Sequence, residues 1–154
     1  MDIRRATITD LEDIRKLNNQ LFKLEKEKYD PTLVENWPLS EEGEKYFTDL
    51  INDNYVIIAV ENDNVIGYLA GSIEEKGSYE LIQYAELNNM LVTDECRGKG
   101  VGKQLINHFK DYCKSKEIYN IKVVASHKNK DAINFYHKNG FNDFNLTLTM
   151  NIEK

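Results

Sequence analysis

The chain has 154 residues, of which 41% are hydrophobic and 30% are charged, and it contains 8 glycines and 2 prolines. This length and composition fit one folded domain spanning residues 1–154 and exclude the collagenous, low-complexity and disordered classes. The formal net charge of -6 argues against a nucleic-acid partner, because a protein that binds phosphate backbones presents a basic surface.

The N-terminal residues and the cysteines favour a cytoplasmic protein with no membrane partner. Residues 1–8 are charged and lack the apolar core of a signal peptide, and no stretch approaches the roughly 18 apolar residues of a membrane span. Cys96 and Cys113 form neither a CxxC pair nor a cluster with histidines at metal-ligand spacing. We therefore expect both thiols to be reduced, and we expect no metal site.

The first half of the chain predicts one strand and two helices. Residues 2–8 indicate a short strand, and Thr9-Asp10-Leu11-Glu12 has the form of a capping box that begins a helix. Apolar residues at steps of three and four continue this helix to about Tyr29. Ser40 is placed to cap a second helix over residues 41–52.

A three-stranded meander is expected next. Residues 55–60 and 65–73 are apolar runs rich in β-branched residues, and the turn sequence Asn62-Asp63-Asn64 between them predicts a hairpin. A third strand is expected over residues 81–92. The glycine-rich turn at residues 97–102 then begins a helix, because apolar residues recur at helical spacing after it.

The last part of the chain repeats the order of strand and helix. Residues 121–125 predict a strand, and residues 129–139 predict a helix that ends at Gly140. From Leu146 to Ile152 every second residue is apolar, which describes a half-buried strand. The predicted order is β-α-α-β-β-β-α-β-α-β, an α/β chain (α+β, mixed sheet) with helices on the faces of the sheet. The last strand either completes a homodimer through sheet pairing or forms an edge within the chain.

The turn at residues 97–102 has the chemistry of an anion site. Unpaired amides and the positive end of the helix dipole converge where a helix begins. Glycines let the backbone approach an anion, and Arg97, Lys99 and Lys103 add positive charge. The spacing matches neither GxxxxGK[ST] nor a strict GxGxxG, so it favours a diphosphate ligand outside those two classes. A plain flexible turn is the alternative.

Two segments of the chain resemble the GNAT superfamily of acyl-coenzyme A N-acyltransferases. Arg97-Gly98-Lys99-Gly100-Val101-Gly102 matches the family's Q/R-x-x-G-x-G/A pyrophosphate motif, with a strand before it. Asn129 to Phe141 looks like the second motif, N-x-x-A-x-x-F-Y-x-K-x-G-F. The motifs lie within residues 85–103 and 129–141. The resemblance implies a GNAT-like fold over roughly residues 2–150, in which the central strands separate at a bulge.

The resemblance also implies acetyl-coenzyme A as the cofactor and places it in the chain. The amides of the glycine turn would hold the pyrophosphate, the backbone of Leu91 and Val92 would pair with the pantetheine, and Asn129 would touch the same arm. The amide near Met90 would be the oxyanion donor. The expected cofactor-binding residues are Leu91, Val92, Arg97, Gly98, Lys99, Gly100, Val101, Gly102, Lys103 and Asn129.

Transfer of an acetyl group to an amine needs a base and an acid, because the amine is protonated at neutral pH and the thiolate must leave. Glu86 is the candidate base, and its alternative is a charged strand residue that recognises substrate or faces solvent. An unperturbed glutamate with a pKa of about 4.3 is a poor base, so burial has to raise the pKa or a water has to relay the proton. Tyr136 resembles the tyrosine that many members place beside the sulfur; its alternative is a packed aromatic.

The acceptor is expected between the first two helices and the opened sheet. Phe22, Tyr29 and Trp37 would form apolar walls there, with Glu86 at the amine end. We therefore predict an N-acetyltransferase that acts by direct attack in a ternary complex, on a small cationic amine that suits the acidic chain. A protein α-amine or lysine is the alternative acceptor, and an acyl-coenzyme A sensor or interaction module without catalysis is the alternative of another class.

Overall fold

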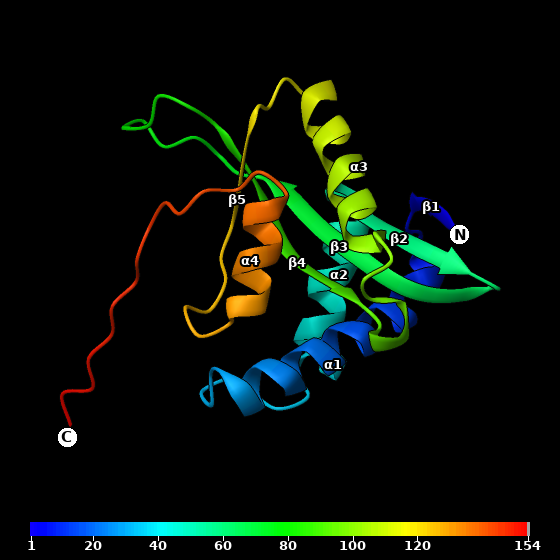
Figure 1. The fold of residues 1–154 in the computed structure, drawn as a ribbon, viewed down its shortest axis with the longest axis horizontal. Coiled ribbons are helices and arrows are strands. Elements are labelled where there is room, and N and C mark those ends of the chain that lie inside the picture. Colours follow the sequence, from blue (N-terminus) through cyan, green and yellow to red (C-terminus); the bar gives the residue numbers. More distant parts are fainter. Residues whose placement is uncertain (154) are drawn as a thin grey trace.

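In a computed structural model, residues 1–153 are described and form a five-stranded mixed sheet with helices on both faces (Figure 1). The strands lie in chain order across the sheet: β1 (Asp2–Arg5), β2 (Tyr55–Glu61), β3 (Asn64–Ile73), β4 (Tyr84–Val92) and β5 (Asn120–Val123). Strands β1 to β4 pair antiparallel, and β5 pairs parallel to β4. The fold class predicted from the sequence is confirmed.

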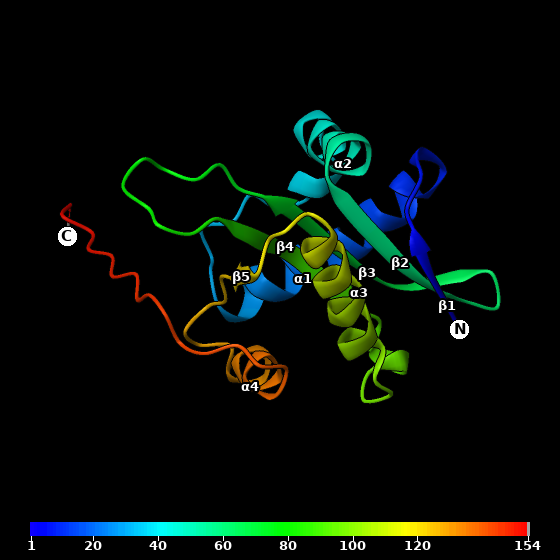
Figure 2. The same cartoon turned by 90° about the horizontal axis from the view of Figure 1, so that it is seen from above.

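Four helices cover the sheet: α1 (Leu11–Lys28), α2 (Glu41–Asp53), α3 (Val101–Ser115) and α4 (Lys130–Lys138). Helices α1 and α2 lie on one face of the sheet, and α3 and α4 lie on the other (Figure 2). The side chains of α1 and α2 pack in one hydrophobic core, and those of α3, with partly buried residues of α4, pack in the other. Short 3-10 turns lie at Ile8–Asp10, Trp37–Leu39 and Asp94–Cys96. Among residues 1–153, none of these helices combines the length and the apolar character that crossing a membrane requires.

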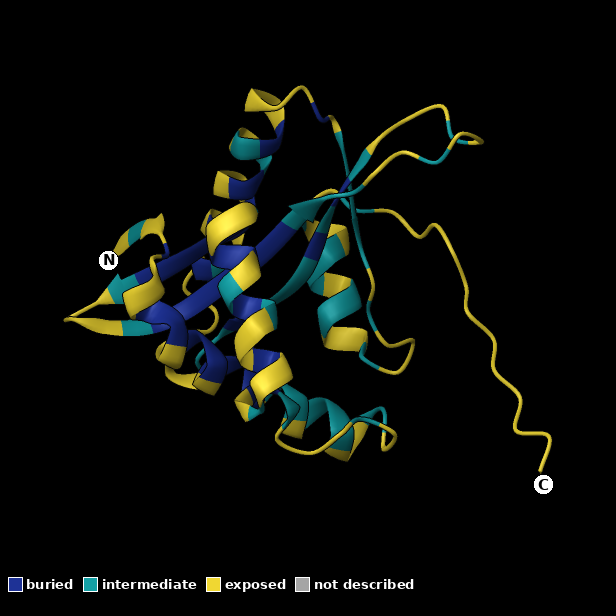
Figure 3. Ribbon diagram, turned by 180° about the vertical axis from the view of Figure 1, so that it is seen from behind, coloured by how far each residue is buried: buried dark blue, intermediate teal, exposed yellow. Residues whose placement is uncertain are grey.

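The alternation of a strand explains why the sheet supports two cores. In β2, Ile57 and Ala59 pack with the α3 side, whereas Val56 and Ile58 pack with the α1 and α2 side. All four are at most 1% exposed. The middle of the sheet is therefore buried on both faces (Figure 3), which explains the nearly continuous apolar run in this strand.

The start of the first helix differs from the sequence prediction. The capping box is formed by Thr7 and Asp10 around the first 3-10 turn, and α1 begins at Leu11, so Thr9 and Glu12 are not its members. The Asp10 carboxylate accepts a hydrogen bond from the Thr7 backbone N–H at 2.8 Å and a fork of two from Arg4 at 2.9 and 3.0 Å. The ion pair with Arg4 favours this register, and sequence spacing alone does not reveal it.

The second helix begins as predicted, but the strand predictions need correction. Ser40 Oγ accepts a hydrogen bond from the Gly43 N–H at 3.2 Å and caps α2. The first strand ends at Arg5 rather than at residue 8, and the strand predicted at residues 121–125 covers Asn120–Val123. Strand β4 begins at Tyr84, because the preceding Leu81 is 96% exposed and lies in a loop. The strand predicted from Leu146 to Ile152 does not form in the described chain. A strand needs a hydrogen-bonded neighbour, and this segment runs away from the sheet (Figure 1).

Candidate active site

The centre of the site is a bulge in β4. Ala70 of β3 faces Asn89, and the next residue, Gly71, faces Leu87, so Asn88 is the extra residue. Ser72 Oγ of β3 donates a hydrogen bond to the Asn88 side-chain oxygen at 2.9 Å. The pairing of β4 with β5 ends at the same level, at Leu87 opposite Val123. Within residues 1–153, the edge of β4 beyond the bulge therefore has no neighbouring strand.

Some backbone groups along this open edge form no hydrogen bond with a neighbouring strand in the described chain. The Thr93 N–H donates to the Ile66 carbonyl of β3 at 2.9 Å. Consecutive residues of a ladder face opposite edges, so Met90 and Val92 direct their backbone groups to the open side. In agreement, the Val92 carbonyl accepts from Arg97 Nε at 2.9 Å rather than from β3.

The glycine turn between β4 and α3 depends on a left-handed backbone. Gly98 and Gly100 have φ values of +76° and +83°, and an added Cβ at either position would meet no atom within 4 Å. Glycine is therefore required here by the backbone conformation and not by a lack of space for a side chain. Arg97 closes the turn through an ion pair with Asp94 at 2.7 Å. The exposed Lys99 and Lys103 leave positive charge at the start of α3.

The third glycine of the motif has a packing role. A Cβ on Gly102 would lie 2.9 Å from Phe135 Cζ and 3.6 Å from Met90 Cε. Phe135 therefore holds α4 against the first turn of α3, and the small residue permits this contact. The second sequence motif thus packs directly on the first.

Tyr136 lies on α4 beside the opening. Its ring packs edge to face with Phe141 at a centroid distance of 5.4 Å. Burial raises the pKa of Tyr136 to about 12, and the charge of Glu25 on α1 acts in the same direction. Tyr136 thus packs as an aromatic and also keeps a protonated hydroxyl at neutral pH. Asn129 caps α4, and its Oδ1 accepts from the Ala132 N–H at 3.1 Å.

Glu86 belongs to a cluster of charges on the α1 and α2 side of β4. Its neighbours Ala85 and Leu87 face the opposite core. Burial raises the pKa of Glu86, and a hydrogen bond with Glu74 and the charge of Glu74 raise it further, while Lys122 lowers it. Lys122 forms an ion pair with Glu74 at 2.7 Å, which lowers the pKa of Glu74. The proton of the pair therefore favours Glu86, and its pKa is raised in the direction that a base requires.

The predicted acceptor walls are brought together only in part. The rings of Phe22 and Trp37 stack at 5.8 Å, and Trp37 meets Tyr46 edge to face at 5.7 Å. Tyr29 instead ends α1, where its N–H donates to the Glu25 carbonyl. In the described chain, the ring of Tyr29 does not stack with Phe22, Trp37 or Tyr46.

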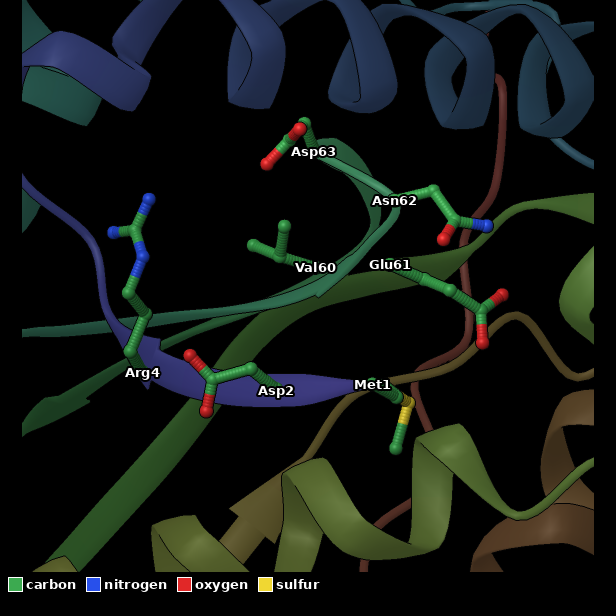
Figure 4. Close-up of a pocket in the computed structure, with 7 residues that line it drawn as sticks. All are labelled: Met1, Asp2, Arg4, Val60, Glu61, Asn62 and Asp63. Carbon is green, nitrogen blue, oxygen red and sulfur yellow. The ribbon is translucent and has the colours of Figure 1, made fainter.

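Two hollows of the surface are not lined by Glu86 or Tyr136. One is an open depression between the start of β1 and the β2–β3 turn, lined by Met1, Asp2, Arg4, Val60, Glu61, Asn62 and Asp63 (Figure 4). Its arginine is engaged by Asp10, and none of the predicted site residues lines it. A second hollow, of about 440 Å³, includes Phe22 but neither Glu86 nor Tyr136.

The sequence analysis missed a buried polar network beneath the bulge. Asn18 Nδ2 of α1 donates to the Tyr68 hydroxyl at 2.8 Å, and Asn89 Nδ2 donates to the Tyr46 hydroxyl at 3.3 Å. Asn18 also approaches Asn89 Oδ1 at 3.4 Å. The network joins α1, α2, β3 and β4 at the level where the sheet opens. In the sequence, this network is indicated only by a polar residue, Asn18, beside the apolar stripe of the first helix.

Glu25 is a second acid that sequence reasoning did not single out. Burial and the charge of Asp30 raise the pKa of Glu25. Its charge in turn raises the pKa of Tyr136 and of Tyr68. Glu25 of α1 and Tyr136 of α4 therefore lie within electrostatic reach, although their helices belong to different layers. No group of three or more metal-ligating side chains occurs in the part of the chain that the structure describes.

Comparison with known families supports the resemblance found in the sequence. A family model described as the acetyltransferase (GNAT) family matches residues 11–141. An uncharacterized N-acetyltransferase of Methanocaldococcus jannaschii is 26% identical over 142 residues, 92% of this chain and 60% of that protein. The uncharacterized N-acetyltransferase YhfO of Bacillus subtilis is 26% identical over 151 residues, 93% of this chain and 91% of that protein. The chain thus spans three fifths of the archaeal relative and most of the bacterial one.

Solved structures share the fold. A tetramutant of the BH1408 protein of Bacillus halodurans has a TM-score of 0.88 at 18% identity, covering 99% of this chain and 100% of that one. A predicted acetyltransferase of Clostridium acetobutylicum with acetyl-CoA has a TM-score of 0.78 at 22% identity, covering 99% and 96%. The aminoglycoside N-acetyltransferase AAC(6')-Iy in complex with CoA has a TM-score of 0.73 at 19% identity, covering 97% and 98%.

The match covers most of the chain, and both motifs lie within it. The chain belongs to the acetyltransferase (GNAT) family. Acetyl-coenzyme A is the cofactor that the resemblance to this family implies, and it contains the diphosphate that the glycine turn predicts.

Proposed function

We propose that this chain transfers the acetyl group of acetyl-coenzyme A to the primary amine of a small cationic molecule at the open edge of β4. The observation that carries the proposal is the placement of two groups about this edge. Glu86, with its raised pKa, lies on the α1 and α2 side, and Tyr136, with a pKa of about 12, projects from α4. A base and an acid are thus available on either side of the strand.

The cofactor is proposed to lie between the glycine turn and the open edge of β4. The amides of the turn from Gly98 to Gly102, of which residues 98–100 are exposed, are proposed to provide the donors that a pyrophosphate needs, and Arg97, Lys99 and Lys103 provide the charge. The Val92 N–H, which the ladder directs to the open edge, is proposed to pair with the pantetheine as a strand would. The backbone of Leu91, also expected there, faces Tyr68 of β3 instead. Val101 and Asn129 complete the proposed contacts at the starts of the two helices.

The proposed reaction is a direct attack. The acceptor enters as an ammonium ion and gives one proton to Glu86. The freed nitrogen lone pair then forms a bond to the carbonyl carbon, and a second N–H proton leaves to water. The Met90 N–H, which the ladder directs to the open edge, stabilises the negative charge on the carbonyl oxygen. The carbon–sulfur bond then breaks, and the Tyr136 hydroxyl donates its proton to the departing thiolate. The hydroxyl is suited to this step because its raised pKa keeps it protonated at neutral pH.

The charge around the site supports a cationic acceptor. Three acids, Glu25 of α1, Glu74 just after β3 and Glu86 of β4, are proposed to face the acceptor, and the chain carries a net charge of -6. Among the proteins with this fold are aminoglycoside acetyltransferases, one of them solved with sisomicin. Both observations favour a small polyvalent amine over a neutral acceptor.

The test combines cofactor binding with turnover. The chain is titrated with acetyl-coenzyme A by calorimetry, and thiol release is then followed over polyamines, aminoglycosides, amino acids and peptides with free α-amines or lysines. We expect binding, and release with one class of small amine. Release only with peptides would favour the protein acceptor, and binding without release would favour a sensor.

The role of Tyr136 is tested in the same assay by Tyr136→Phe. Loss of the acid is expected to lower kcat by about 10²-fold or more while leaving the affinity for acetyl-coenzyme A unchanged. The matched control is Tyr119→Phe, since Tyr119 is 71% exposed and outside the site. Equal kcat values for the two variants would contradict the proposed acid.

A further inference from the structure

Two asparagines stand in succession in the middle of a largely buried strand. Asn88 and Asn89 follow Leu87, which is 1% exposed, and precede Leu91, which is 7% exposed. Asparagine is depleted in strands, and its side chain competes for the hydrogen bonds of the backbone. Residues that contradict the preference of their own element are typical of functional sites.

The side chains of both asparagines are held by hydrogen bonds. The Asn88 oxygen accepts from Ser72 Oγ of β3 at 2.9 Å. The Asn89 side-chain nitrogen donates to the Tyr46 hydroxyl of α2 at 3.3 Å, and its oxygen accepts from Asn18 of α1 at 3.4 Å. Asn89 is thus connected to both helices that cover this face of the sheet.

Asn18 supports this network from inside the core. It is 2% exposed, and its Nδ2 also donates at 2.8 Å to the hydroxyl of Tyr68, which is 0% exposed. Burying polar side chains is unfavourable unless they are hydrogen-bonded, whereas apolar side chains of the same shape would serve the core equally well. The stability of the core alone therefore does not explain why polar groups lie here.

The peptide between Asn89 and Met90 carries the proposed oxyanion donor. Asn89 pairs with Ala70 of β3. Every second pair of an antiparallel ladder exchanges both of its hydrogen bonds, and the Thr93 N–H donates to the Ile66 carbonyl, so Asn89 belongs to the bonded set. The Asn89 carbonyl therefore points to β3. Because the trans peptide is planar, the Met90 N–H points the opposite way, to the open edge.

The strands restrain this peptide from one side only. Toward the end of β4, the pairing with β3 continues to Val92, but toward the start it is interrupted at once by the extra residue Asn88. On the other edge, within residues 1–153, β5 pairs only as far as Leu87. The side chain of Asn89 supplies a restraint that the neighbouring strands do not.

We propose that Asn89 is a positioning residue for acetyl transfer: its side chain, held by Asn18 and Tyr46, keeps the Met90 N–H aimed at the carbonyl oxygen of acetyl-coenzyme A. This inference rests on the proposed function, in which that N–H stabilises the charge on the oxygen. A donor that is fixed before the reaction stabilises this charge without having to reorient. The neutral amide of Asn89 also adds no negative charge beside the developing oxyanion.

The test measures how strongly the site polarises the carbonyl group of bound acetyl-coenzyme A. The probe is acetyl-coenzyme A isotopically labelled at this carbonyl carbon, and infrared difference spectroscopy follows its stretching band in the complex with the full chain. A hydrogen bond from the Met90 N–H lowers the stretching frequency relative to the free thioester. We expect this downshift in the unaltered protein. We expect Asn89→Ala to lose most of it, while the calorimetric affinity for the cofactor is unchanged.

Tyr46→Phe tests the same restraint with a smaller change, since it removes one hydroxyl and keeps the ring. We expect it to reduce the downshift as well. The matched control is Tyr55→Phe, because the Tyr55 hydroxyl also forms a 3.3 Å hydrogen bond, to the His108 carbonyl, and its ring packs in the core on the other face of the sheet. We expect this control to keep the full downshift.

Asn18→Ala removes the support from α1 without altering β4. Its matched control is Asn19→Ala, since Asn19 is 6% exposed and donates to Asn36 rather than to β4. A purely structural network would lower the stability of both variants in urea unfolding and leave the infrared band in place. A positioning network reduces the downshift in Asn18→Ala alone.

The outcomes separate this inference from the proposed function. A full downshift in Asn89→Ala would overturn the positioning role and leave the proposed function standing. If Asn89→Ala does not fold, the same result in Tyr46→Phe and Asn18→Ala decides. Binding without a downshift in the unaltered protein would overturn the role of Met90, and no binding would overturn the proposed function; either result would remove the positioning role as well.

Discussion

The antiparallel part of the sheet and the part of the chain that follows α3 differ in how they are completed. In β2 and β3, Ile57, Ile58 and Leu69 are at most 1% exposed, and helices cover both faces. Among the described residues beyond Ile118, none falls in the buried class. Yet this second region contains β5, α4 with Tyr136, and the segment from Leu146 to Ile152, in which every second residue is apolar.

We infer from this difference that the first region is covered by the chain's own helices, whereas the second region becomes covered only when a ligand binds. The proposed cofactor would add to the open edge of β4, beyond the pairing with β5. Half-buried aromatics such as Phe135 and Phe141 are suited to this situation, because they pack against the core and still leave room for a contact.

The largest expected effect breaks the scaffold. Leu105 on α3 is 0% exposed, and Leu105→Ala is expected to lower the free energy of unfolding by about 2–5 kcal/mol, through lost burial and the cavity left behind. Urea unfolding followed by circular dichroism measures the change. The matched control is Leu81→Ala, at a residue 96% exposed, with an expected change within about 0.5 kcal/mol. Similar losses for both variants would contradict the division into two regions.

Most of the scaffold could be predicted from the sequence, since its signals are local. Apolar periodicity placed the helices, and Ser40 caps α2 as expected. The start of α1 was misplaced because it depends on Arg4, which reaches Asp10 from another element. The strand expected at residues 146–152 does not form, because a strand needs a hydrogen-bonded neighbour as well as an alternating pattern, and the described chain supplies none there.

The site was predictable where a short motif carries it and not where distant segments meet. The glycines at 98 and 100 were recognised, and their left-handed backbone explains them. The reason for Gly102 is its contact with Phe135, which lies more than thirty positions away. The raised pKa of Glu86 depends on Glu74 and Lys122, and no spacing in the sequence joins these three. Tyr29 was expected in the acceptor wall. It follows the end of α1 at Lys28, and within the described chain its ring does not stack with Phe22 or Trp37.

An intermediate effect is expected when coenzyme A binds to the second region. A ligand that binds only the folded state at a hundred times its Kd stabilises by about 2.7 kcal/mol. Coenzyme A is therefore expected to raise Tm, and its hydrogen-exchange protection should concentrate in the glycine turn, the open edge of β4 and residues 120–141. Amides of β2 and β3 should change little.

Gly100→Val is the control for this protection. Its backbone has φ +83°, which a β-branched residue adopts only with strain, so the pyrophosphate cradle should be lost. The variant is expected to show neither the Tm shift nor the local protection. Protection spread evenly over the sheet would contradict the idea that the cofactor completes one region.

The smallest expected effect is a difference between the pH at which activity falls and the lower pH at which the fold loses stability. Asp10 in the scaffold has its pKa lowered by the hydrogen bonds from Arg4, so its stabilisation is present above the unfolded pKa of about 3.9 and is lost as the pH falls through the folded value. Glu86 has its pKa raised by burial and by Glu74. As a base it must be ionised, so activity should fall first on acidification, above the ordinary glutamate range, while the fold persists.

Two variants that replace a carboxylate with an amide test which group causes the loss of stability at low pH and which causes the loss of activity. Asp10→Asn keeps an acceptor for the Thr7 N–H and removes only the charge, so the expected loss of unfolding free energy at pH 7 is about 0.2–1 kcal/mol, and this loss should shrink as the pH falls below about 4. Its kcat/KM profile should keep the acid limb of the unaltered protein. Glu86→Gln should do the reverse, removing the acid limb of kcat/KM together with most of the activity. An acid limb that survives Glu86→Gln would show that another group, such as Glu25 with its own raised pKa, receives the proton from the amine.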